Sequence, residues 1–159
     1  MPLIKANLKN DILSIFDAVD DGTTYESAAE TIGEAIISYS NPIIYAVNGK
    51  PPMDQSFKAN LATSAIPSAP NGKFMLRFAD WLAAYTAQFP AGMIAAGATA
   101  ATPPAGLAAL KITLLTIWGT PVSPIPNSRQ IFATKFSTAV DVYMRTGTYT
   151  IGTVVSPWS

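Results

Sequence analysis

The sequence predicts a mainly α-helical (α+β) domain, a bundle of about five amphipathic helices with short β-strands at its periphery. Apolar residues recur at three- and four-residue spacing in several long segments, which is the period of a helix with one buried face. Short runs rich in Thr, Val, Ile and Tyr follow some of these segments, as is typical of strands. Apolar residues make up 49% of the 159 residues, enough to form the core of one domain over residues 1–159.

The first two helices are predicted over residues 3–19 and from residue 23 to about residue 40. Apolar residues of the first helix form one stripe: Ile4, Leu8, Ile12, Ile15 and Val19. Thr23 and Glu26 match a capping box at the start of the second helix, and Pro42 ends it because the residue before a proline avoids helical geometry. The apolar run 43–47 follows, and Pro51 and Pro52 are predicted to close this unit.

The central part of the chain predicts two further helices. The segment 53–65 is ambiguous, but residues 73–89 form a strong amphipathic pattern that Pro90 ends. Residues 91–101 are small and apolar, and are expected to be a loosely specified strand or an irregular segment. A helix with proline in its first turn is predicted to begin at residues 102–104 and to bury Leu107, Leu110, Leu114 and Ile117.

The C-terminal part predicts a helix, a glycine stop and a strand. Asn127 or Ser128 is expected to cap the helix, and Gly147 is expected to end it in the left-handed conformation. Residues 148–155 then suit one strand that Pro157 closes. Its alternating pattern places Tyr149, Ile151, Thr153 and Val155 on one face.

A common pattern recurs in three predicted helix–strand units, which are residues 23–52, 72–103 and 127–157. The N-terminal helix 3–19 precedes these units. Aligning Tyr39, Tyr85 and Tyr143 places small residues six positions earlier, namely Gly33, Ala79 and Ser137. We expect this small column to let another helix approach closely. Two explanations remain open: an ancient duplication, or similar local architecture without duplication.

Composition excludes several classes of function. The chain has ten basic and ten acidic residues, and its zero net charge argues against nucleic acid as the main partner. It has no Cys and no His, which removes thiolate chemistry and the commonest metal ligand and general base. The N-terminus lacks the apolar core of a signal peptide, and the apolar stretch 89–109 is too broken by Pro and Gly for a membrane span. We therefore expect no cofactor, no metal and no membrane partner.

The carboxylates do not form a convincing catalytic set. Glu26, Glu30 and Glu34 fall on one helix face and are expected to be solvated rather than catalytic. Asp80 and Asp141 are predicted to pair with Arg77 and Arg145 along their own helices. No nucleophile elbow, phosphate loop or dinucleotide fingerprint occurs. We expect no catalytic residues and no enzyme activity.

Several local features of the chain occur together: Leu-Lys-x-Asp-Ile over residues 8–12, helices of the Ala-x-x-Ile/Leu-x-x-Tyr type, the run Thr-Gly-Thr-x-x-Ile-Gly-Thr-Val-Val over 146–155, and Pro-rich connectors. In these features the chain resembles the small virion structural proteins of tailed bacteriophages. The resemblance implies a non-enzymatic structural component of a capsid, neck, tail or baseplate. It also implies a homo-oligomer whose partners are copies of itself and other virion proteins, in a virion assembled in the host cytoplasm.

The C-terminal strand is the expected interface. Its edge is unprotected unless another strand pairs with it, and strand addition by a neighbouring subunit would satisfy it. Trp158 has no evident partner within the chain and suits docking on a neighbour. The predicted interface residues are Tyr149, Ile151, Thr153, Val155 and Trp158. One alternative is an intramolecular sheet that pairs residues 43–47 with 148–155, and another is a helical adaptor or scaffold module that binds a protein partner.

Overall fold

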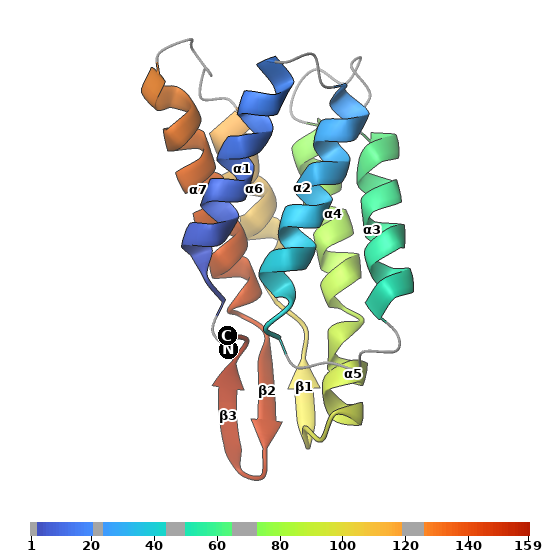
Figure 1. Ribbon diagram of the computed structural model, residues 1–159. Helices are drawn as coiled ribbons and strands as arrows, with labels where there is room; N and C mark the ends of the chain where they lie inside the picture. The colour runs from blue at the N-terminus through green and yellow to red at the C-terminus, as the bar shows by residue number, and fades with distance from the viewer. Residues whose placement is uncertain (1–2, 21–23, 44–49, 65–72, 119–125) are drawn as a thin grey trace.

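A computed structural model of the chain describes residues 3–20, 24–43, 50–64, 73–118 and 126–159. The described part is a bundle of α-helices with a small antiparallel sheet at one end (Figure 1). The helices are α1 (Lys5–Asp20), α2 (Tyr25–Ser40), α3 (Lys50–Ser64), α4 (Lys73–Thr86), α5 (Phe89–Ala95), α6 (Leu107–Trp118) and α7 (Pro126–Met144). The strands are β1 (Ala100–Thr102), β2 (Thr148–Ile151) and β3 (Val154–Pro157). The predicted fold class is confirmed.

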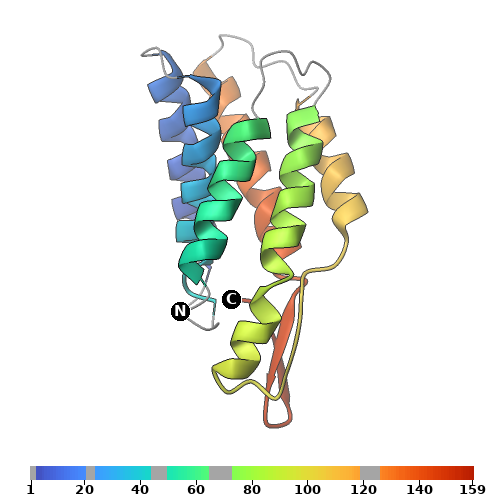
Figure 2. The same cartoon turned by 90° about the vertical axis from the view of Figure 1, so that its right-hand side faces the viewer.

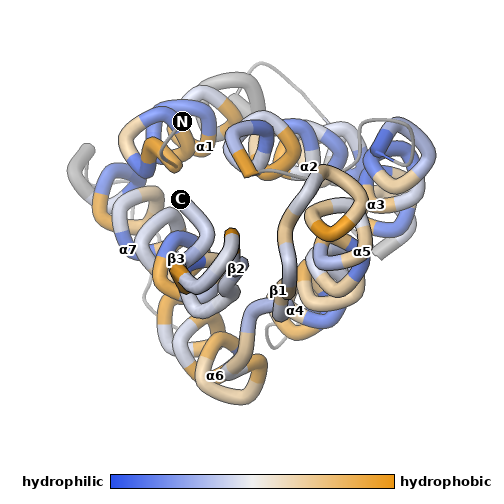
Figure 3. The backbone as a smooth tube through the Cα atoms, turned by 90° about the horizontal axis from the view of Figure 1, so that it is seen from below, coloured by the Kyte–Doolittle hydropathy of each residue, from blue (hydrophilic) through white to orange (hydrophobic). Residues whose placement is uncertain are grey.

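Six of the helices form a closed ring around the core. The order around the ring is α1, α2, α3, α4, α6 and α7, and α7 packs against α1 to close it (Figure 3). Successive helices of the ring run in opposite directions along its axis (Figures 1 and 2). The helices α2, α4 and α7 therefore all end at the sheet end of the molecule, and α5 continues beyond α4 to pack on β1.

The interior of the ring is filled by the stripes that the periodicity predicts. Fully buried side chains come from every helix of the ring: Leu8, Ile36, Leu61, Phe78, Leu82, Leu114, Phe136 and Val140. The small column Gly33, Ala79 and Ser137 is buried as well. A Cβ atom added at Gly33 would lie 3.1 Å from Cγ of Lys58, so this position does allow α3 to approach α2 closely.

The sheet has the order β1-β2-β3, and both pairs are antiparallel. The prediction of one strand over residues 148–155 is wrong, because Gly152 and Thr153 form a two-residue hairpin loop between β2 and β3. Gly152 has a φ of 63°, which a glycine at the first loop position adopts without the strain of a side chain. Val155 pairs with Thr150, so it lies on the opposite face of the sheet from Tyr149 and Ile151.

Several element boundaries differ from the predictions. Thr24 rather than Thr23 caps α2, because its side chain accepts a hydrogen bond from the Ser27 N–H. Pro51 and Pro52 begin α3 instead of closing the preceding unit, since a missing N–H costs nothing in a first turn. Pro90 likewise lies in the first turn of α5.

Further boundaries shift around β1 and α7. Residues 102–104 do not start α6, since Thr102 belongs to β1 and the helix begins at Leu107. The helix α7 begins at Pro126, so Asn127 and Ser128 lie inside its first turn rather than before it. The apolar run 43–47 and its proposed pairing fall almost wholly outside the described residues, but β2 pairs with β1 and β3.

The aligned tyrosines have a common place in the fold. Tyr39, Tyr85 and Tyr143 lie near the ends of α2, α4 and α7, the three helices that run towards the sheet, and all three are buried. Each of these helices pairs with an antiparallel neighbour that precedes it in the chain, as α1 with α2, α3 with α4 and α6 with α7. The recurring structural feature is thus a pair of antiparallel helices, and a duplication of the predicted units stays a prediction.

Candidate interaction surface

Trp158 closes the sheet end of the ring. Its side chain is fully buried within its own chain. Its backbone N–H donates to the Gly147 carbonyl at 2.9 Å, and its indole Nε1 donates to the Thr148 carbonyl at 3.2 Å. The premise that Trp158 lacks a partner in its own chain is therefore wrong. Trp158 is a core residue of its own chain and is not available to the predicted interface.

Gly147 makes room for this indole ring. A Cβ atom at position 147 would lie 2.6 Å from both Cδ2 and Cε2 of Trp158, closer than real Cβ contacts come. The residue does not have the left-handed φ that was predicted for a helix stop. Glycine is needed here because a rigid aromatic ring lies against its Cα atom. The backbone conformation at this position would not by itself require glycine.

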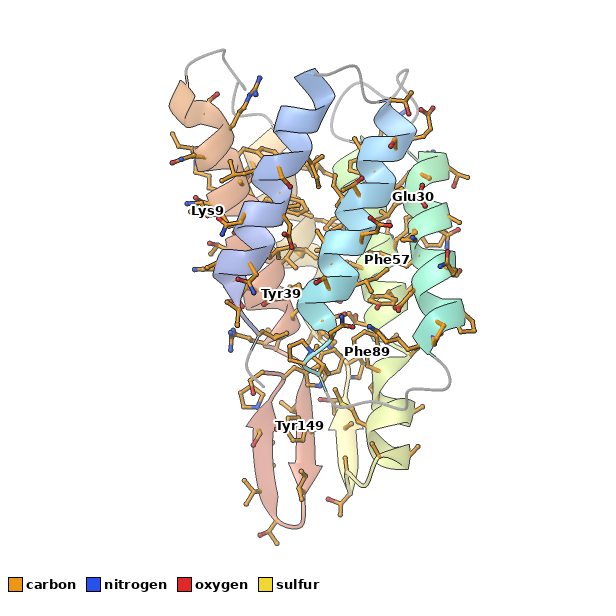
Figure 4. All side chains as sticks on the ribbon, in the orientation of Figure 1. Lys9, Glu30, Tyr39, Phe57, Phe89 and Tyr149 are labelled. Atoms are coloured by element: carbon orange, nitrogen blue, oxygen red, sulfur yellow. The ribbon has the colours of Figure 1, made fainter. Side chains whose placement is uncertain are left out.

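A row of aromatic side chains connects Trp158 to the helices at the sheet end of the molecule. Trp158 stacks on Phe89 with ring centroids 5.5 Å apart. Phe89 meets Tyr85 edge-on at 4.9 Å, and Tyr85 stacks on Phe57 of α3 at 4.6 Å. Figure 4 labels Phe89 at the junction between the helices and the sheet, and Phe57 further up between α2 and α3. The C-terminus is thereby held by residues from α3, α4 and α5.

Polar groups at the same end tie the helices together. The Tyr39 hydroxyl donates to Oδ1 of Asp141 on α7. Arg145 contacts the same carboxylate oxygen through Nε at 2.9 Å and donates through Nη2 to the Leu3 carbonyl at 3.0 Å. The predicted pair of Asp141 with Arg145 is confirmed. It forms part of a network that joins α2, α7 and the residue preceding α1.

The other two tyrosines make comparable contacts. The Tyr85 hydroxyl donates to Oδ1 of Asp54 at 2.6 Å. Burial, followed by the hydrogen bonds to the carboxylates, raises the pKa of Tyr39 and of Tyr85 far above the ordinary value. Burial also raises the pKa of Tyr143, and a hydrogen bond with Thr86 partly offsets this shift. These phenols remain protonated at neutral pH, which suits structural donors and makes them poor nucleophiles.

The two ends of the β2–β3 hairpin differ in solvent exposure. Tyr149 of β2 is partly buried against the core (Figure 4). At the other end, the exposed fractions are 55% for Ile151 and 64% for both Val154 and Val155. These three residues, with Gly152 and Thr153, form what we call the hairpin tip. Four of the five predicted interface residues are thus accessible to different degrees: Tyr149, Ile151, Thr153 and Val155.

Charged residues are distributed unevenly along the chain. No Asp, Glu, Lys or Arg occurs in residues 81–110, 112–128 or 146–159. These segments include α5, the sheet and all of α6 except Lys111, which pairs with Asp80 of α4 at 2.6 Å. Asp80 thus contacts a different cation from the predicted Arg77. Among the described elements, α5 and the three strands therefore carry no charge, and α6 carries one, at Lys111.

The helix α6 is apolar on its outer side as well as on its inner side. Leu110, Leu114 and Ile117 face the core, as predicted. The outward-facing residues include Ile112, which is 66% exposed, and Leu115, which is 37% exposed. A helix that is hydrophobic all round is ordinarily buried, yet within the described chain α6 packs only against α4 and α7 among the helices of the ring. Figure 3 shows its hydrophobic colouring from the sheet end.

An open groove of about 660 Å³ runs between α6 and α7. We call it the α6/α7 groove. Its walls are mainly Ala, Thr and branched apolar residues, including Ile112, Thr113, Thr138 and the 59% exposed Val142. Lys135 is the one charged residue among the described residues that line it. Periodicity identified the inner side of α6, but the uncovered outer side appears only when the packing of the ring is known.

The opposite side of the ring carries more of the charge. Lys58 of α3 contacts Glu34 at 3.0 Å and Glu30 at 3.7 Å, both on α2. The hydrogen bond to Glu34 is the main cause of a raised pKa at Lys58. Glu30 and Glu34 remain more than half exposed, and Figure 4 labels Glu30 on the side of α2 that faces α3. Through Lys58, these carboxylates join α2 and α3 at the surface.

Neither a metal-binding cluster nor a membrane-spanning helix is found among the described residues. No group of three or more His, Cys, Asp or Glu residues in this part of the chain is arranged to hold a metal ion. None of the helices in the ranges described combines the length and the hydropathy needed to cross a membrane.

Comparisons with known proteins returned no relative. No protein-family model, curated protein or solved structure matches the chain.

Proposed function

We propose that this protein is a non-enzymatic structural subunit that acts by self-assembly. The observation that carries the proposal is α6, whose outer side is mainly apolar, carries no charge and is left uncovered by the residues that the structure describes. Association with further copies would bury Ile112, Leu115 and Val142 and remove the cost of exposing them to water. Particular members of the class are proposed from the sequence resemblance alone, namely components of a tailed-phage capsid, neck, tail or baseplate.

The proposed partners are copies of the chain and adjoining virion proteins, in a particle assembled in the host cytoplasm. A subunit present in many copies needs surfaces that face neighbours rather than solvent, and low charge reduces repulsion between such surfaces. The test is light scattering coupled to size exclusion over a wide range of protein concentration, followed by electron micrographs of the largest species. A monomer at every concentration would exclude self-assembly.

The second candidate function is a helical adaptor that binds a different protein. The α6/α7 groove favours it, because a long apolar groove between two helices suits an amphipathic helix of a partner. In this case the purified chain stays monomeric. The size measurement therefore separates the two candidates.

A further inference from the structure

The described residues leave two apolar surfaces of the molecule uncovered. One is the hairpin tip, which projects from the sheet end away from the helices (Figures 1 and 2). The other is the α6/α7 groove on the side of the ring. We infer that the hairpin tip of one copy inserts into the α6/α7 groove of a second copy, so that subunits join head to tail. This inference rests on the proposed function and names the surfaces that mate.

The two surfaces match in chemistry. The tip carries Ile151, Val154 and Val155, with no charge in residues 146–159. The groove is lined by branched apolar, Ala and Thr side chains, and Lys135 is its one charge among the described lining residues. Bringing these surfaces together desolvates few charges, whereas the charged α2 and α3 surface would leave unpaired groups facing the tip.

The two surfaces also match in form. The tip is narrow because its loop has only two residues. The groove has a volume of about 660 Å³, and pockets of roughly 300–1,000 Å³ bury most of the surface of a drug-sized ligand. Three branched side chains on a narrow tip are of that size. The volume of the groove is therefore large enough for the side chains of the tip.

A copy cannot fill its own groove. The base of the hairpin is fixed by Trp158 under the ring and by the pairing of β2 with β1. Its tip points away from the ring, while the groove extends along the helices from Thr146 to Ile117. A hairpin tip that fills this groove must come from another molecule. A chain that carries both the projecting tip and the groove supplies that occupant itself.

Other pairings of two copies cover less of the exposed surface. Packing α6 against α6 of a second copy fills the grooves but leaves both tips in water. Pairing β3 with β3 extends the sheet but leaves the grooves open, and it is limited to four residues that end at Pro157, which has no N–H to donate. Insertion of the tip covers both surfaces with one contact. Such a contact is heterologous, so repeating it generates a ring or an open helical filament.

Engineered cysteines give a direct test, because the chain has none of its own. We would prepare Val154→Cys at the tip and Thr113→Cys in the groove, one of them labelled with ¹⁵N, and oxidise them separately and as a mixture. Both positions are exposed, so both variants should fold. We expect the mixture to yield the disulfide-linked heterodimer, identified by intact mass, and each variant alone to stay largely uncrosslinked. A variant that carries both cysteines should give a ladder of higher species.

The other outcomes overturn the inference. A dominant Val154→Cys homodimer would indicate pairing of tips or β3 edges, and a dominant Thr113→Cys homodimer would indicate packing of α6 on α6. If the wild-type protein is oligomeric by light scattering but the mixture of the two cysteine variants gives no cross-link, the inference fails and the proposed function stands. A monomeric wild-type protein would remove both.

A charge placed in the groove provides a second measurement. Thr113→Lys should weaken association at least about tenfold, because insertion of the tip would bury an unpaired ammonium group. Thr63→Lys on α3 is the matched control, since Thr63 is also exposed and its hydroxyl also bonds a carbonyl of its own helix. It should leave association unchanged. Equal effects of the two substitutions would contradict the inference.

Discussion

The base and the tip of the C-terminal hairpin belong to one short segment but have opposite surroundings. At the base, Gly147 and Trp158 are buried against each other, and the indole ring stacks on Phe89. At the tip, Ile151 and Val154 are more than half exposed. The hydrophobic effect drives both regions to leave water. The base does so within the chain, and in our proposal the tip does so within an assembly.

This difference shows that apolar residues near a chain end do not all serve the same purpose. An indole that donates one hydrogen bond and stacks on a buried ring contributes to the stability of the single chain. An exposed valine on a two-residue loop contributes almost nothing to it. Substitutions at the base should therefore change the free energy of unfolding, and substitutions at the tip should change association alone.

Trp158→Ala should have the largest effect on stability. It removes a fully buried indole and leaves a cavity between Gly147 and Phe89, which costs about 3–5 kcal/mol. Ile151→Ser at the tip is the control from the same hairpin and should change the free energy of unfolding by less than about 0.5 kcal/mol. Urea unfolding followed by circular dichroism measures both, at concentrations where the protein is monomeric. Equal losses would remove the distinction between base and tip.

Gly147→Ala should have the next largest effect. Its Cβ atom would lie 2.6 Å from two ring atoms of Trp158, and a rigid ring cannot move aside without disturbing Phe89, so we expect a loss of about 1–3 kcal/mol. Gly33→Ala is the milder comparison: its Cβ atom would lie 3.1 Å from Cγ of Lys58, 3.3 Å from Cδ1 of Leu61 and 3.4 Å from the Lys58 Cα atom, and the helix preference of alanine partly offsets these tight contacts. Thermal unfolding should show a lower midpoint for Gly147→Ala than for Gly33→Ala. A reversed order would show that the packing of Trp158 on Gly147 is not what fixes this position.

The sequence predicted the helices of the ring better than it predicted either part of the hairpin. Helical periodicity is a local signal, and it correctly identified the buried faces that include Leu110, Phe78 and Phe136. The burial of Trp158 depends on Phe89, which lies 69 positions earlier in the chain (158 − 89). No local pattern contains such a contact.

The hairpin was missed for a different reason. Gly152-Thr153 is a weaker turn signal than Asn-Gly, and its flanking residues all suit a strand. The α6/α7 groove also escaped prediction, because which side of a mostly apolar helix stays uncovered depends on its neighbours in the ring. Local preference therefore determined the helices, whereas the candidate interaction surface depends on how those helices pack.

The buried tyrosines extend the comparison from the hairpin base into the ring, with the smallest expected effect. Tyr39→Phe removes a hydrogen bond to Asp141, but Arg145 still contacts this carboxylate, so we expect a loss of only about 1–2 kcal/mol. Tyr85→Phe should behave similarly, since Lys50 remains 3.5 Å from Asp54. If either substitution costs as much as Trp158→Ala, the polar contacts and not the indole dominate this end of the molecule.

The same tyrosines predict how stability depends on pH. The pKa of Tyr39 and of Tyr85 is raised in the folded chain, so folding favours the protonated phenols. Their contribution is complete below the unfolded pKa of about 10 and is lost as pH rises above it, by about 1.4 kcal/mol per pH unit for each tyrosine. Unfolding curves between pH 8 and 12 should show a flat region followed by this decline. The double Phe variant should decline less steeply, although Tyr143 and Lys58, whose pKa values are also raised, still contribute. An unchanged slope would mean that Tyr39 and Tyr85 ionise in the folded chain as readily as in the unfolded one, and that the sheet end does not hold their hydroxyl groups away from water.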